Sequence, residues 1–76
     1  MNNTRRKALN TLQEQIDDII TALEELRTEE EEYLENIPEN LQGSERYEKA
    51  EECVGELEDA ISNLEYAVEN IINAIS

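Results

Sequence analysis

The chain has 76 residues with 20 acidic and 6 basic side chains, no histidine, two glycines and a formal net charge of −14. A chain of this length forms one small domain with a limited core, and its charge disfavours binding to nucleic acid or to an anionic membrane surface. The commonest general base, the usual nitrogen ligand for metals and the glycine-rich phosphate loop are all missing. We therefore expect a protein that is not an enzyme and that holds no cofactor and no metal.

A first helix is predicted over residues 4–36. Its apolar side chains recur at alternating three- and four-residue steps, which is the spacing of a heptad seam. The predicted seam comprises Leu9, Leu12, Ile16, Ile19, Leu23, Leu26, Tyr33 and, just past the helix, Ile37. Glu30 occupies the one apolar slot that is missed. This spacing predicts a helix that packs along its whole length against another helix.

A turn is predicted over residues 37–44. Pro38 disfavours helical geometry at Ile37, and Ser44 offers a side-chain N-cap to the helix that follows. Leu41 is apolar within this polar segment. It is expected to fold back onto Ile37 and Tyr47 and close the end of the core, and the alternative is a solvent-exposed loop leucine.

The second helix is predicted over residues 45–75. Its seam keeps the same stepping without an exception: Tyr47, Ala50, Val54, Leu57, Ile61, Leu64, Val68, Ile71 and Ile75. If the chain reverses near residues 40 and 41, residue i faces roughly residue 81 − i, and the two seams meet in register. The sequence thus predicts an all-α fold, an antiparallel two-helix coiled-coil hairpin that forms a single domain over residues 1–76.

The apolar content exceeds what one seam requires. Small residues recur every seven positions beside the second seam, at Cys53, Ala60, Ala67 and Ala74, and Ile20, Leu34 and Ile72 widen the stripes further. A homodimer that pairs two hairpins into a four-helix bundle would cover these positions. The alternative is that the alanines are simply good helix formers at the edge of the core.

Acidic side chains occupy the positions that the seams leave to solvent. From residue 8 onward 20 acids stand against only three basic residues, a net charge of −17. On a rod of about 48 Å this is one charge per roughly 3 Å, against one per about 1.7 Å of duplex DNA. The surface could therefore mimic DNA and bind a basic nucleic-acid-binding site on another protein; the alternative is that the acids serve solubility alone. The candidate partner-binding acids are Asp17, Asp18, Glu24, Glu25, Glu31, Glu32, Glu52, Glu56 and Asp59.

Several single residues add further expectations. Tyr66 points outward and is a candidate aromatic anchor for a partner, Cys53 is interpreted as a small buried hydrophobe, and Gly55 could permit close approach of a partner. The basic residues of the segment 5–7 are expected to cap the carboxyl end of the second helix. One cysteine cannot form an internal disulfide, and neither a leader nor a run of about 18 apolar residues is present, so a cytoplasmic location is expected.

The turn and the start of the second helix carry a resemblance. Residues 38–52 read PENLQGSERYEKAEE and precede repeating Leu-Glu-Ala-Ile patterns. This segment, together with the basic start before a long acidic helix, resembles small acidic helical proteins of unknown function from phages and mobile elements of Gram-positive bacteria. The resemblance implies a phage-encoded inhibitor of a host defence or DNA-handling protein, similar to anti-CRISPR proteins that mimic DNA, acting in the host cytoplasm. It implies no catalytic residues.

Overall fold

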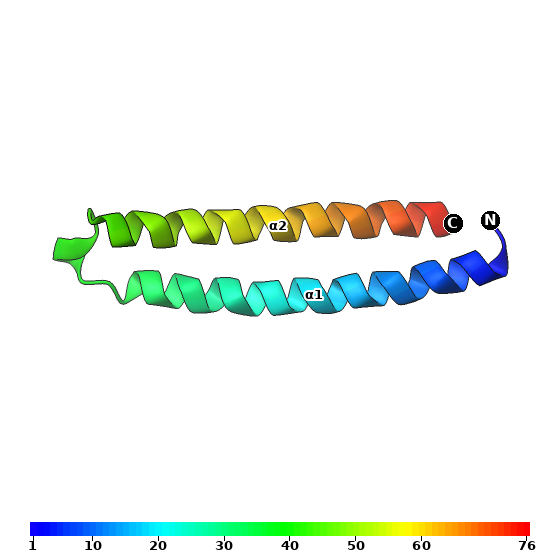
Figure 1. Cartoon of the computed structure of the whole chain (residues 1–76), viewed down its shortest axis with the longest axis horizontal. Helices are drawn as coiled ribbons and strands as arrows, with labels where there is room; N and C mark the ends of the chain where they lie inside the picture. Colours follow the sequence, from blue (N-terminus) through cyan, green and yellow to red (C-terminus); the bar gives the residue numbers. More distant parts are fainter.

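The computed structural model covers residues 1–76 and is an antiparallel helical hairpin (Figure 1). Helix α1 spans Asn3–Glu35, a single 3₁₀ turn, η1, spans Glu39–Leu41, and helix α2 spans Glu45–Ile75. The two long helices pack against each other and there is no strand. The predicted all-α hairpin is therefore confirmed.

Side-chain caps define where both long helices begin. The side chain of Asn2 accepts a hydrogen bond from the backbone N–H of Arg5 at 2.8 Å, and the Ser44 hydroxyl accepts one from the N–H of Tyr47 at 3.3 Å. Each bond satisfies one of the N–H groups that the first turn of a helix leaves without a partner. The predicted N-cap at Ser44 is confirmed. Pro38, with φ −55° and ψ 143°, keeps the chain extended between α1 and η1.

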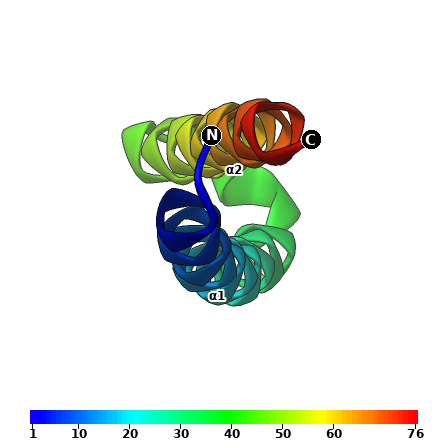
Figure 2. The same ribbon diagram turned by 90° about the vertical axis from the view of Figure 1, so that its right-hand side faces the viewer.

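The molecule is a thin rod with extents of 59 × 15 × 13 Å. Both chain termini lie at the end opposite the turn (Figure 1), and Figure 2 views the pair of helices from that end. There the guanidinium Nε of Arg6 donates a hydrogen bond to the backbone carbonyl of Ile75 at 3.2 Å. A cation at the carboxyl end of a helix also complements the helix dipole. The predicted capping of the second helix is thus confirmed for Arg6, whereas Arg5 and Lys7 are exposed.

The seam of α2 is the one predicted. All nine of its residues are buried or half-buried, and Ala50 and Ile61 are only 4% exposed. They face α1 at three- and four-residue steps along the whole helix.

The seam of α1 is only half as predicted. Leu9, Ile16 and Leu23 face α2 and are half-buried, but the alternate positions of the predicted seam are wrong. Leu12, Ile19, Leu26 and Tyr33 are exposed, and their places in the seam are taken by Gln13, Ile20, Arg27 and Leu34. Either group would form a heptad pattern with Leu9, Ile16 and Leu23. In the structure, α1 is rotated so that the group that includes Gln13 and Ile20 faces α2.

The core is thin. Only Ile20, Ala50 and Ile61 count as buried, and no side chain is completely enclosed. At the turn, Leu41 and Ile37 line a hollow of about 230 Å³, yet Leu41 is 49% exposed, so it closes the end of the rod only in part. Neither long helix contains a stretch that is both long enough and apolar enough to cross a membrane.

Candidate binding surfaces

The hairpin has two flanks of opposite chemical character. In an antiparallel helix pair, equivalent heptad positions of the two helices lie on the same side of the shared seam. On one side of the seam lie the residues that directly precede every second seam residue of each helix. We name this side the apolar flank. It comprises Leu12, Ile19, Leu26 and Tyr33 of α1 with Cys53, Ala60, Ala67 and Ala74 of α2.

The opposite side collects residues that come directly after the remaining seam residues. We name it the acidic flank; it comprises Asp17, Glu24 and Glu31 of α1 with Glu51, Glu58 and Glu65 of α2. Five of these six residues are exposed and Glu31 is half-buried. Along each helix, successive members are seven residues, or about 10 Å, apart. Two rows of carboxylates, one on each helix, therefore run along the middle of the rod on one side of the seam, over about 20 Å.

The apolar flank pairs large side chains on α1 with small ones on α2. Leu12, Ile19 and Leu26 are 49%, 51% and 52% exposed. On α2, Ala60 and Ala67 are half-buried and Ala74 is exposed. Cys53 is a free, exposed thiol, so the predicted burial of Cys53 is wrong. It lies one position outside the seam, where nothing within a single hairpin covers it.

Charge is segregated between the two sides. The outer helix positions that border the apolar flank are 8, 15, 22 and 29 on α1 and 49, 56, 63 and 70 on α2, and Arg5 and Arg46 continue the flank at its ends. We name the apolar flank together with these positions the neutral side. It holds two acids, Glu29 and Glu56, and three cations, Arg5, Arg46 and Lys49, which gives a net charge of +1. Since the whole chain carries −14, the remaining surface carries −15.

The nine acids predicted to bind a partner do not form one surface. Six of them form a continuous band along α1, with Asp17, Glu24 and Glu31 on the acidic flank and Asp18, Glu25 and Glu32 on the adjacent outer face. Glu52 and Asp59 lie on the outer face of α2, and Glu56 lies on the neutral side. All nine are exposed except Glu31, which is half-buried.

Three acids of α2 complete the acidic flank and were missed by the sequence interpretation. Glu51, Glu58 and Glu65 recur every seven residues, each directly after a seam residue of α2. This recurrence was visible in the sequence. What was missing was the rotation of α1, which decides that these three face the same side as Asp17 and Glu24.

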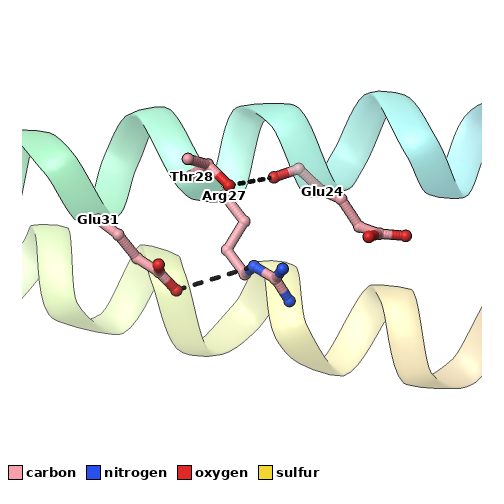
Figure 3. A network of polar contacts seen from close by, with 4 residues as sticks. All are labelled: Glu24, Arg27, Thr28 and Glu31. Carbon is pink, nitrogen blue, oxygen red and sulfur yellow. Dashed lines mark hydrogen bonds and ion pairs between the residues drawn. The ribbon is translucent and has the colours of Figure 1, made fainter.

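One cation interrupts the seam. Arg27 points from α1 toward α2 (Figure 3), and its side chain is 30% exposed. Its Nε lies 3.7 Å from the Oε1 of Glu31, and this nitrogen is buried without a hydrogen bond. One turn away from Glu31, the hydroxyl of Thr28 donates to the backbone carbonyl of Glu24 at 3.0 Å (Figure 3). Arg27 thus places a single positive charge beside one row of the acidic flank.

Two aromatic side chains lie at distinct places on the rod. Near the turn, the guanidinium carbon of Arg46 lies 5.6 Å from the centroid of the Tyr33 ring, and the Nε of Arg46 donates a hydrogen bond to the Tyr33 hydroxyl. This is a cation–π arrangement at an exposed site. Tyr66 is 70% exposed on the outer face of α2, on the same helical row as Glu52 and Asp59. No three carboxylate or thiol side chains converge as ligands of a metal ion.

No family model matches the sequence, and no curated protein or solved structure is detectably similar to it.

Proposed function

We propose that this protein is a non-catalytic inhibitor that binds, through its acidic surface, a basic nucleic-acid-binding site on another protein. The observation that carries the proposal is the charge segregation: −15 is concentrated away from the neutral side, with six of the carboxylates arranged in the two rows of the acidic flank. A loosely distributed acidic surface would serve solubility equally well. Two straight rows of charge on a rigid support are a feature of a duplex.

The charge density supports this mimicry. Spread along the 59 Å rod, −15 corresponds to about one charge per 4 Å, compared with one per about 1.7 Å in duplex DNA. Packed helices are about 8–10 Å apart, so the separation of the two rows is comparable to the groove widths of B-DNA, about 6 and 12 Å. The helices hold both rows in place, and a partner therefore does not have to order them upon binding.

The resemblance to small acidic phage proteins indicates the setting. The partner in this proposal is a host defence or DNA-handling protein in the cytoplasm of a Gram-positive bacterium. Arginine and lysine side chains of its nucleic-acid groove would contact Asp17, Glu24 and Glu58 in place of phosphates. Such an interaction depends on charge and makes few hydrophobic contacts. Its affinity should therefore fall steeply as the salt concentration is raised.

A paired charge reversal tests the proposal. Glu24→Lys with Glu58→Lys changes the acidic flank, and Glu29→Lys with Glu56→Lys makes the same change in net charge on the neutral side. Tagged wild-type protein and both variants would be incubated with lysate at about 0.1 M and 0.5 M salt, which are close to and well above physiological screening. The proteins retained would be identified, purified and assayed for displacement of labelled duplex DNA.

The expected result is a basic nucleic-acid-binding protein that is retained by wild type and by the Glu29/Glu56 variant. Retention should be lost in the Glu24/Glu58 variant, at high salt, and on adding DNA. Equal retention by both variants, or binding with which DNA does not compete, would contradict the proposal.

The apolar flank favours a second candidate function, that of a homodimeric structural or adaptor protein whose acids only keep it in solution. This candidate expects the Glu24/Glu58 variant to behave like wild type, and the Glu29/Glu56 variant, whose neutral side carries +5, to self-associate more weakly. It also expects association that is unchanged or strengthened at 0.5 M salt, since screening reduces repulsion between acidic chains.

A further inference from the structure

We infer that the apolar flank is the contact surface for a second copy of this chain, and that two hairpins pack face to face into a four-helix bundle with both turns at the same end. The inference is independent of the proposed inhibition. In this arrangement the acidic flanks of both copies remain on the outside of the bundle.

The first argument is that a single hairpin leaves too much apolar surface uncovered. A two-helix coiled coil needs two apolar positions per heptad, whereas helices that face the core of a larger bundle carry a third. Leu12, Ile19 and Leu26 supply that third position on α1, and each is about half exposed. The hairpin exposes 5749 Å², while a compact monomer of this mass is expected to expose about 4,800 Å².

Charge identifies the second copy as the occupant. Two molecules that each carry −14 repel one another in every orientation that brings their acidic surfaces together. The neutral side, with a net charge of +1, is the surface on which both molecules can meet without burying rows of carboxylates. A strongly basic partner, by contrast, would gain nothing from this side and would be drawn to the opposite one.

The size of the surface is also sufficient. A face of the rod measures about 59 by 15 Å, on the order of 900 Å², and a stable protein interface buries about 800 Å² per partner. Short chains commonly acquire an adequate core by associating with one another. A two-helix rod would do so by burying one such face.

Shape complementarity fixes the orientation. A two-fold axis along the rod places α1 of each copy over α2 of the other, large residues over small ones. Within one chain residue i lies at the level of residue 81 − i, as the Arg6–Ile75 hydrogen bond shows, and this axis preserves the levels between copies. Ile19 then meets the space between Ala60 and Ala67 of the second copy. Two-fold axes that reverse the rod would place leucines over leucines and alanines over alanines.

The same axis also pairs the charges on the neutral side. In height along the rod, Lys49 is level with residue 32 of α1. It therefore lies about one helical turn from Glu29 of the second copy. Arg5 lies at the level of the carboxyl end of α2 of the second copy, where a cation complements the helix dipole. The few charges on this side are thus distributed as a self-complementary surface requires.

Sedimentation equilibrium tests the contact. Wild type is expected to sediment at twice the 8.8 kDa mass of the chain at micromolar concentration. Ile19→Gln with Leu26→Gln should weaken self-association at least tenfold. The control is Ile72→Gln, which changes a residue that is 46% exposed but lies on the side of the acidic flank, and it should leave association unchanged. A wild type that is monomeric at about 100 µM and 0.5 M salt, or a control that weakens association equally, would overturn the inference.

A distance measurement decides the orientation in a protein whose interface is nearly intact, and it holds even if the glutamine variants fail to fold. Gln42 is exposed at the turn and the only cysteine is Cys53, so Cys53→Ala with Gln42→Cys provides one site for a spin label. With the turns at one end, the labels of the two copies should be roughly 20–30 Å apart, about two to three helix diameters. A separation near the 59 Å length of the rod, or the absence of any pair, would overturn the proposed bundle.

Discussion

Replacing Arg27 with leucine should stabilise the hairpin, because a charged side chain occupies a position in the seam. About 70% of the Arg27 side chain is covered, since 30% is exposed, and its Nε is buried without a hydrogen bond. Its compensation is an ion pair with Glu31 at 3.7 Å. The variant Arg27→Leu therefore exchanges a poorly satisfied cation for an apolar contact in the thin core.

The size of the effect follows from these contacts. Fully burying a leucine stabilises by about 1.5–3 kcal/mol, which is reduced to about 1–2 kcal/mol for a position covered to this extent. The aliphatic stem of arginine already provides part of this packing, and the lost ion pair costs about 0.3–0.5 kcal/mol. We expect the free energy of unfolding to rise by about 1 kcal/mol, equivalent to a Tm higher by about 4–8 °C in a domain of this size.

Urea and thermal unfolding followed by circular dichroism at one fixed chain concentration would measure this change. Gln13→Leu is the matched control, because Gln13 is a half-buried polar residue of the same seam and its replacement leaves the net charge unchanged. If Gln13→Leu stabilises and Arg27→Leu destabilises by 1 kcal/mol or more, the reasoning is refuted. Such a result would mean that Arg27 reduces the repulsion between the acidic rows by more than its contact with Glu31 accounts for.

Four further predictions concern stability. Gly55→Ala should stabilise by about 1 kcal/mol in urea unfolding, because an added Cβ at this helical position meets nothing within 4 Å; destabilisation would indicate a partner at this site. Ser44→Ala should cost about 1 kcal/mol, measured in the same way, through loss of the bond to the Tyr47 N–H, and Ser44→Asp should restore it. Tyr33→Phe removes the hydrogen bond from Arg46 but keeps the ring beneath the guanidinium, so the loss should stay below about 1 kcal/mol at this exposed site. Raising the salt concentration from about 0.05 to 0.5 M should raise the Tm of wild type, since screening weakens the repulsion of a chain with a net charge of −14; an unchanged Tm would show that repulsion is not a significant cost.

The helices and the seam of α2 could be predicted from the sequence because their signals are unambiguous. Along α2, the residues beside the seam are small on one side and mostly glutamate on the other, so only one stripe can form a core. Pro38 and Ser44 mark the chain reversal by local geometry alone. These features need no knowledge of the other helix.

The rotation of α1 could not be predicted in this way. Leu12 and Ile19 compete with Gln13 and Ile20 for the same places, and each set keeps heptad spacing with Ile16. Adjacent residues lie about 100° apart around the helix axis, and because both sets share Ile16, a rotation of α1 by about half of that angle moves a residue from the core to the flank. The choice depends on packing against α2. The composition of both flanks follows from this choice, which is why the acidic flank was only partly recognised.

The positions of the two ends have a consequence for the order in which the hairpin assembles and comes apart. The contact between Tyr33 and Arg46 closes a loop of 13 residues, whereas the contact between Arg6 and Ile75 spans 69. Closing the shorter loop costs less chain entropy, so the turn should form first and the helices should zip together toward the termini, a local route that favours fast folding. A force applied to the two termini would pull the helices apart one seam contact at a time from the open end, and the turn would separate last.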